Sequence, residues 1–178
     1  MDRAALIAAQ LAPHLASGQQ VLEIGAGQGL VAQELQRMTC AQLTLVDVVN
    51  YNQSALPCMT YDGAHLPFPA QSFDYSLLVF VLHHTVEPLL VLREALRVSR
   101  CGVLVCENHV SGWWRQAVTR VVDSLPHFRY GVPICYRTLS VERWQTLASP
   151  LPVRVELLGR FTMGSGFWQN FVMRLTPQ

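Results

Sequence analysis

The sequence predicts an α/β protein built on an open, doubly wound, mostly parallel β-sheet that closes with an antiparallel hairpin strand. Apolar segments of strand length alternate with segments of helical periodicity over residues 19–108. The segment FDYSLLVFVL at 73–82 is almost entirely apolar, as in a central strand that is covered on both faces. Near the C-terminus, VRVELLG at 153–159 and GFWQNFVMRL at 166–175 are joined by RFTMGSG, a connection typical of a hairpin.

The first elements follow this alternation. Residues 3–16 have the spacing of a short amphipathic helix, and QVLEIG at 20–25 is a strand. A second helix is expected at 29–38, because Gln33, Glu34, Gln36 and Arg37 form a polar face. QLTLVDV at 42–48 is the next strand.

The middle of the chain departs from regular alternation at one point. Residues 49–58, VNYNQSALPC, are too short and too polar for a full crossover helix. They lead to a short strand, CMTYD at 58–62, and then to a loop before the strand at 73–82. The next helix is expected at 87–99, because Pro88 suits a first turn and leucines recur at helical spacing.

The second half begins with the strand GVLVCEN at 102–108. A helix is expected at 113–124, and another starts at Ser140, where an N-cap residue precedes an acid in S-V-E-R. We expect one domain over residues 1–178. Its parts are a short N-terminal helix, a cofactor-binding half and an acceptor-side half, at 1–18, 19–108 and 109–178.

Composition excludes several classes of protein. The 178 residues are 51% hydrophobic and 14% charged, which indicates a globular chain. The longest apolar stretch is interrupted by His83, His84, Glu87 and Pro88, so we expect no transmembrane helix. The start of the chain lacks the basic region of a signal peptide, and we expect a cytoplasmic protein.

Charge and cysteine usage narrow the expectation further. The formal net charge is +1 and the arginines form no run, so the basic stripe of a nucleic-acid binder is missing. The cysteines lack CxxC spacing, and we expect reduced, mostly buried thiols without a metal or disulfide role. They are Cys40, Cys58, Cys101, Cys106 and Cys135.

A glycine-rich turn follows the first strand. In QQVLEIGAGQGL, Gly25, Gly27 and Gly29 come directly after an apolar run, and Glu23 stands two residues before the first of them. A dinucleotide fingerprint needs a glycine where Leu30 stands. An acid beside the turn would repel a pyrophosphate, whereas it can accept hydrogen bonds from an ammonium group.

These residues resemble the class I S-adenosylmethionine-dependent methyltransferases, and in particular their ubiquinone/menaquinone-type branch, methyltransferase type 11. The resemblance covers about residues 19–108, through four segments in order: VLEIGAGQG, LTLVDV, YDGAHLPFPAQSFD, and SLLVFVLHHT with LREALRVSRCGVLVCE. It implies a Rossmann-like sheet of seven strands, S-adenosyl-L-methionine as cofactor, and no metal.

The same resemblance implies a set of cofactor-binding residues. Asp47, which ends its strand, would take the ribose hydroxyls, and Asp62 would meet the adenine amino group. Asp62 before Gly63 is also a common turn former, so both interpretations stay open. The expected cofactor-binding residues are Glu23, Gly25, Ala26, Gly27, Gly29, Asp47, Val48, Asp62 and Gly63.

His83 and His84 are the candidate catalytic residues. They follow the central strand, next to the point where the methyl group should emerge, and imidazole titrates near neutral pH. The alternative is structural: one histidine packs near the cofactor and the other fixes the start of the next helix. Glu107 and His109 stand at the start of the segment that builds the acceptor pocket in such enzymes.

The acceptor is expected to be a small or lipid-like molecule, methylated on oxygen, carbon or nitrogen. The stretch LHHT replaces the N-P-P-Y-type motif of amino-methylating enzymes, and no Pro-Cys pair stands there for cytosine chemistry. Aromatic residues after the fifth strand favour an apolar or aromatic acceptor over residues 109–140. They are Trp113, Trp114, His127, Phe128, Tyr130 and Tyr136, and, like Trp144, they would also suit a core.

Two shortenings leave alternatives open. Only about eighteen residues precede the glycine turn, and the crossover between Asp47 and Cys58 is abbreviated. Both would expose the sheet and cofactor, so we consider a homo-oligomer or a partner chain that covers the site. A non-catalytic cofactor-binding subunit is the alternative function. A nucleotide-cofactor oxidoreductase is a third, opposed by Leu30.

Overall fold

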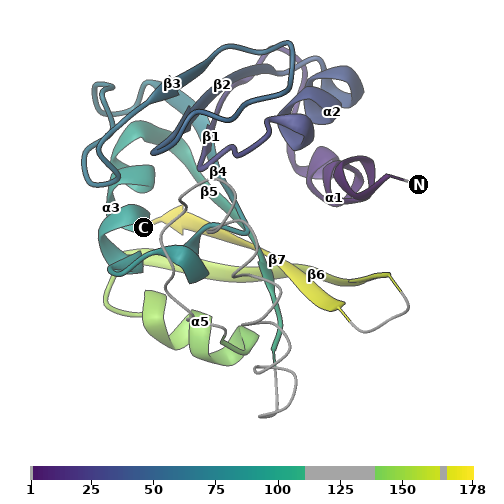
Figure 1. The fold of residues 1–178 in the computed structure, drawn as a ribbon. Coiled ribbons are helices and arrows are strands. Elements are labelled where there is room, and N and C mark those ends of the chain that lie inside the picture. Colours follow the sequence, from purple (N-terminus) through teal and green to yellow (C-terminus); the bar gives the residue numbers. More distant parts are fainter. Residues whose placement is uncertain (1, 111–138, 165–167) are drawn as a thin grey trace.

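The computed structural model describes residues 2–110, 139–164 and 168–178, and its centre is one mixed β-sheet (Figure 1). The strand order is β3-β2-β1-β4-β5-β7-β6. Strands β1 to β5 run parallel, and β7 runs antiparallel between β5 and β6. This confirms the predicted fold class. The strands are β1 (Gln20–Ile24), β2 (Gln42–Asp47), β3 (Cys58–Thr60), β4 (Phe73–Val79), β5 (Ser99–Asn108), β6 (Val153–Met163) and β7 (Trp168–Pro177).

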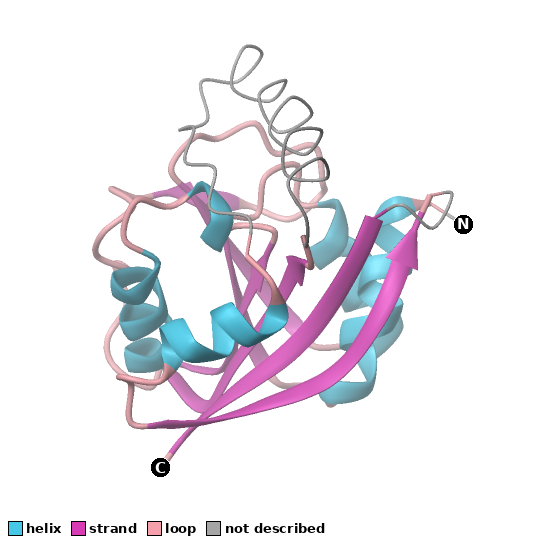
Figure 2. Cartoon of the chain, turned by 90° about the horizontal axis from the view of Figure 1, so that it is seen from below, coloured by secondary structure: helices cyan, strands magenta, loops and turns pink. Residues whose placement is uncertain are grey.

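Helices cover both faces of the sheet, as Figure 2 shows from below. Two hydrophobic clusters form the core, one on each face. Leu77 of β4 belongs to the cluster under α1 and α2, whereas its neighbour Leu78 belongs to the cluster under α3 and α5. This alternation is what a buried parallel strand requires. The helices are α1 (Arg3–Leu11), α2 (Leu30–Thr39), α3 (Pro88–Val98) and α5 (Val141–Ala148), with 3₁₀ turns η1 (Ala12–His14) and η2 (Leu82–His84).

Local sequence signals explain the helix boundaries. Pro88 occupies the first turn of α3, and the Ser140 side chain accepts a hydrogen bond from the Arg143 amide to cap α5. Both were predicted. The helix expected over 3–16 was too long, because α1 ends at Leu11 and the chain tightens into a 3₁₀ turn that contains Pro13. The helix expected at 113–124 lies outside the described residues.

Two strand boundaries differ from the prediction. The strand expected at 73–82 ends at Val79, because Phe80 takes a left-handed conformation with φ of 56° and turns the chain out of the sheet. The Phe80 amide then donates to the Cys106 carbonyl at 2.8 Å. Strand β6 continues through Met163, which pairs with Trp168, so residues 160–163 belong to the hairpin strands and not to their connection.

Asp74, at the opening of β4, links three strands. Its carboxylate accepts from the Gln20 amide at 2.8 Å and from Arg100 at 3.0 Å, which ties β1, β4 and β5 together.

The thiols were expected to be mostly buried, and this expectation was wrong. Among the four described, Cys106 is buried, Cys58 is partly buried, and Cys40 and Cys101 are exposed. Cys135 lies outside the described residues.

No helix in the described ranges is both long and apolar enough to cross a membrane.

Candidate functional site

The glycine turn lies where β1 leaves the sheet. The amides of Gly25 and Ala26 both donate to the Val46 carbonyl of the neighbouring strand β2, at 2.8 and 3.1 Å. The turn therefore folds over the end of β2 before α2 begins. Gly29 is the N-cap of α2 with φ of 72°, a conformation that a residue with a Cβ rarely adopts.

The abbreviated crossover between β2 and β3 packs directly on this turn. A Cβ on Gly29 would collide with the Asn52 side chain and would lie 2.5 Å from the Ser54 hydroxyl. A Cβ on Gly27 would lie 3.3 Å from the Tyr51 hydroxyl. The amides of Gln53 and Ser54 donate to the Gln28 carbonyl. The crossover thus supports the turn, although it forms no helix.

Asp47 joins the end of β2 to the glycine turn. It is only 7% exposed, and its Oδ2 accepts from the Gly27 amide at 2.7 Å. Its Oδ1 accepts from the Val49 amide at 3.2 Å. Sequence reasoning placed both residues at one site, and the structure brings them into direct contact.

Val48 and Gly63 lie side by side next to this contact. Val48 is an exposed apolar side chain, and a Cβ on Gly63 would lie 3.0 Å from its Cγ1. The two residues therefore lie against each other at the carboxyl edge of the sheet.

Asp62 forms a turn, one of the two roles that the sequence left open. Its Oδ1 accepts from the amides of Ala64 at 2.8 Å and His65 at 2.7 Å. These two amides lower the pKa of the Asp62 carboxyl. The side chain is exposed, so the turn fixes a carboxylate at the surface beside Gly63.

Glu23 is a buried acid beneath the glycine turn. It is 2% exposed, and its Oε2 finds no hydrogen-bond partner in the part of the chain that the structure describes. Burial raises the pKa of the Glu23 carboxyl to about 8, a hydrogen bond from the Ala32 amide opposes this shift, and the nearby Asp47 adds to it. The Glu23 carboxyl therefore holds a proton more readily than an exposed acid does.

His83 is paired with Glu107. The His83 Nδ1 lies 2.7 Å from the Glu107 Oε2, and the His83 amide donates to Oε1 at 3.4 Å. Both side chains are almost fully buried. Sequence reasoning named both residues but missed their contact. The available signal was position: each follows the carboxyl end of one of two adjacent parallel strands, β4 and β5.

His84 and His109 have different surroundings. The rings of His84 and His83 are tilted against each other with centroids 4.0 Å apart. Burial, and then the neighbouring His83, lower the pKa of His84 to about 4, so its ring is neutral at pH 7. His109 was a candidate for the acceptor pocket, and its Nδ1 accepts from the Val141 amide at 3.2 Å, at the start of α5.

The aromatic candidates divide into two groups. Trp144 is 1% exposed and belongs to the core between α5 and the sheet, which is the structural one of its two expected roles. Trp113, Trp114, His127, Phe128, Tyr130 and Tyr136 lie outside the described residues. Among the residues that are described, no group of three or more His, Cys, Asp or Glu side chains is placed to hold a metal ion.

Sequence comparison gives related proteins with a common description. The family described as "Methyltransferase domain" matches residues 22–106. A demethylmenaquinone methyltransferase of Paenarthrobacter aurescens is 32% identical over 120 residues, which cover 61% of this chain and 47% of that protein. One of Tropheryma whipplei is 29% identical over 150 residues, covering 72% of this chain and 61% of that protein. The chain thus spans about half the length of the first of these relatives.

Solved structures show the same fold. The YcgJ protein of Bacillus subtilis has a TM-score of 0.73 at 14% identity, covering 99% of this chain and all of that one. A SAM-dependent methyltransferase of Aquifex aeolicus has a TM-score of 0.71 at 18% identity, covering 99% and 94%. The matched segment holds the glycine turn, Asp47, Asp62 and His83, and together these likenesses support a class I S-adenosylmethionine-dependent methyltransferase of the ubiquinone/menaquinone type.

Proposed function

We propose that this chain binds S-adenosylmethionine at the carboxyl ends of β1 and β2 and transfers its methyl group to a small apolar or aromatic molecule. The observation that carries the proposal is the contact between Asp47 and the Gly27 amide. This contact places a carboxylate beside a backbone turn that a ligand can approach closely. Both lie at the edge of the sheet where open α/β sheets bind their ligands.

The surrounding residues fit the parts of this cofactor. Asp47 accepts hydrogen bonds from the ribose hydroxyls, and its present amide contacts hold it in place for them. The purine lies on Val48 and Gly63, beside the Asp62 carboxylate. Glu23, with an oxygen that is unpartnered among the described residues, ionises when the ammonium group approaches.

The bound cofactor supplies a methyl group already activated by its positive sulfur. The chain then has to align the acceptor, exclude water and take up a proton where the acceptor loses one. We assign proton uptake to His83. The Glu107 carboxylate lies 2.7 Å from Nδ1 of this ring and would stabilise the imidazolium that forms.

The names of the related proteins favour a quinone-type ring as acceptor. Both curated relatives are called demethylmenaquinone methyltransferases. A reduced quinone is an aromatic molecule with ring hydroxyls, and removal of a hydroxyl proton makes oxygen and the ring carbons nucleophilic. A buried carboxylate–imidazole pair beside the cofactor site suits that deprotonation.

Calorimetry with S-adenosylhomocysteine and with NADH tests the cofactor. We expect saturable heat with the first ligand and none with the second; the reverse result contradicts the proposal. Formation of S-adenosylhomocysteine from S-adenosylmethionine only in the presence of a hydroquinone then tests catalysis. Binding without turnover across hydroquinones and simple phenols would instead favour the non-catalytic subunit.

A covering chain is part of the same proposal. Met59, on the short edge strand β3, and Val48, which follows β2, are both exposed apolar side chains. A second copy or a partner chain over this edge would shield them from water. Analytical ultracentrifugation over a range of concentrations tests the self-associating form, which predicts a mass that rises with concentration and stays at one chain in a Met59→Glu variant.

A further inference from the structure

The loop at residues 61–72, which carries Asp62 and Gly63, is attached to helix α3 by two side chains. The Arg97 Nη1 donates to the Phe68 carbonyl at 2.9 Å, and its Nη2 donates to the Leu66 carbonyl at 3.1 Å. The Glu94 carboxylate accepts from the Leu66 amide at 3.0 Å. The loop has no ladder of its own at these positions, so α3 satisfies three of its backbone polar groups.

Glu94 and Arg97 also hold each other. The Arg97 Nε donates to one Glu94 oxygen at 2.7 Å, and Nη2 donates to the other at 2.8 Å. The pKa of Glu94 is lowered and that of Arg97 is raised, in each case mainly by this mutual hydrogen bond. An exposed i,i+3 pair contributes little by itself. Here the paired geometry aims the guanidinium at the loop carbonyls.

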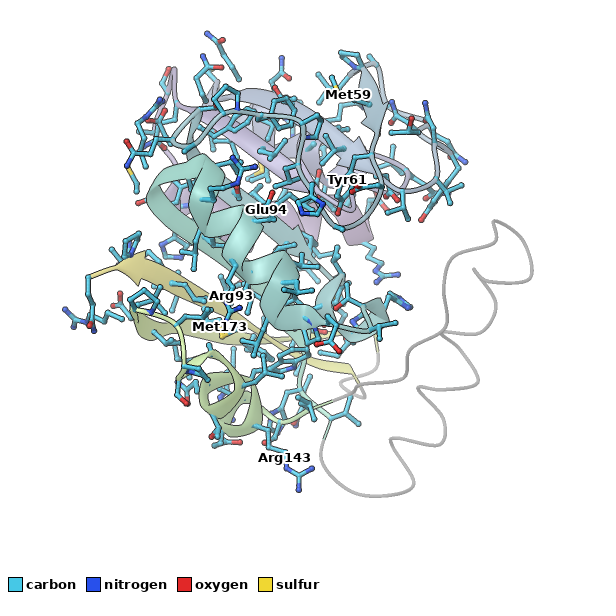
Figure 3. The ribbon with its side chains drawn as sticks, turned by 90° about the vertical axis from the view of Figure 1, so that its left-hand side faces the viewer. Met59, Tyr61, Arg93, Glu94, Arg143 and Met173 are labelled. Atoms are coloured by element: carbon cyan, nitrogen blue, oxygen red, sulfur yellow. The ribbon has the colours of Figure 1, made fainter. Side chains whose placement is uncertain are left out.

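This attachment holds the same loop whose Gly63 lies against Val48. Figure 3 shows Glu94 on the side of α3 that faces Tyr61 and the loop, with Arg93 on the other side of the helix. Asp62 closes its turn onto His65, and the next residue, Leu66, bonds to Glu94. A small hollow separates loop and helix, lined by Ile24, Tyr61, Gly63, Ala64, Leu66, Val91 and Glu94.

We propose that Glu94 and Arg97 are positioning residues for the purine of the cofactor: they fix the loop so that Asp62 and Gly63 meet the purine edge. This inference rests on the proposed function, because it needs the cofactor at Val48 and Gly63. Neither residue contacts the reacting atoms. Their effect is on recognition of the exocyclic amino group, which donates a hydrogen bond to the Asp62 carboxylate.

Two ligands that differ at that amino group separate positioning from general stability. S-adenosylhomocysteine carries it, and S-inosylhomocysteine has a carbonyl oxygen there. We expect the wild-type chain to prefer the first by about tenfold or more, the scale of one hydrogen bond to a charged group. In Arg97→Ala that preference should fall toward one, through weaker binding of S-adenosylhomocysteine alone. Arg97→Lys, which keeps the charge but loses the fork, should lie between.

Arg93→Ala is the matched control, since Arg93 is exposed on the same helix, and it should keep the wild-type preference. Glu94→Gln provides a second variant if Arg97→Ala does not fold, and should also reduce the preference. Equal weakening of both ligands by Arg97→Ala or Glu94→Gln, or an unchanged preference, overturns the inference alone. A wild-type chain that binds neither ligand overturns the proposed function, and this inference with it.

Discussion

Glu23 and Asp47 are both buried acids at the carboxyl edge of the sheet, yet their surroundings differ. Asp47 accepts hydrogen bonds from two backbone amides, which hold its carboxylate in place. Glu23 has one oxygen without a partner among the described residues, and burial raises its pKa to about 8. We therefore expect Asp47 to accept hydrogen bonds from neutral hydroxyls and Glu23 to pair with a cation.

The raised pKa of Glu23 predicts a pH-dependent stability. Between the unfolded value of 4.5 and about 8, the folded chain binds more protons at this position than the unfolded chain does. Raising the pH through this range therefore lowers the free energy of unfolding, by up to about 1.4 kcal/mol per pH unit. Glu23→Gln should remove this contribution. Urea unfolding of both proteins at several pH values measures it, and parallel pH profiles would contradict the assignment.

Asp47→Asn should weaken the binding of S-adenosylhomocysteine by about 1.5–3 kcal/mol, because it removes a charged acceptor and places an NH₂ group where Gly27 or the ribose donates. Calorimetry measures the change. Asp74→Asn is the matched control: Asp74 is also hydrogen-bonded to a backbone amide, but at the opposite end of the sheet. It should lower stability and leave affinity unchanged, and similar affinity losses in both variants would refute the assignment of Asp47.

At the scale of elements, the crossover between β2 and β3 supports the glycine turn without forming a helix. Asn52 is its centre: its Oδ1 accepts from the Ser54 amide at 3.0 Å and lies 2.8 Å from the Ser54 hydroxyl, and its Nδ2 donates to the Leu56 carbonyl at 2.5 Å. These side-chain bonds replace the backbone ladder that a helix would have supplied.

Asn52→Ala should therefore lower the free energy of unfolding by about 1–3 kcal/mol, since it removes the donor to the Leu56 carbonyl and the acceptor for the Ser54 hydroxyl. Urea denaturation measures the loss. Gln53→Ala, at an exposed position between Asn52 and Ser54, should change the free energy of unfolding by less than about 0.5 kcal/mol. Equal losses would show that the crossover is stabilised by its backbone alone.

The limits of sequence reasoning are clearest at the ends of elements. Alternating periodicities predicted the sheet, its hairpin and the capped helices, because these depend on the burial of repeated apolar residues. The predicted end of β4 was wrong, because the residues FVL continue the apolar run in the sequence. Only the paired strand and the turn to η2 impose the left-handed conformation of Phe80. The His83–Glu107 contact was missed for a related reason, since 24 residues separate the two and register alone brings them together.

At the scale of the whole molecule, the candidate site depends on segments far apart in the sequence. The Gly25–Gly29 turn, Asp47, the 61–72 loop and His83 all meet at one edge of the sheet, as the strand order requires. A ligand that bridges them stabilises the native chain by binding it and not the unfolded one. Stability should thus report cofactor binding without any knowledge of the acceptor.

S-adenosylhomocysteine at about one hundred times its dissociation constant should raise the free energy of unfolding by about 2.7 kcal/mol. A thermal denaturation scan should show the corresponding rise in Tm, while NADH at the same concentration should leave Tm unchanged. Asp47→Asn should reduce the rise in proportion to its loss of affinity. A rise with NADH instead would favour the oxidoreductase alternative.

The insertion of β7 between β5 and β6 has a consequence for synthesis on the ribosome. The inner edge of β5, with Val103 to Cys106 fully buried in the finished sheet, meets only β7 on that side, and β6 pairs with β7 alone in the described sheet. Both strands leave the ribosome before their shared partner does. The nascent chain therefore carries an open apolar edge until residues 168–177 emerge, and it is during this interval that chaperones should bind it. A chain truncated just before β7 would keep the residues of the proposed cofactor site, yet it would be prone to aggregate through the open edge of β5.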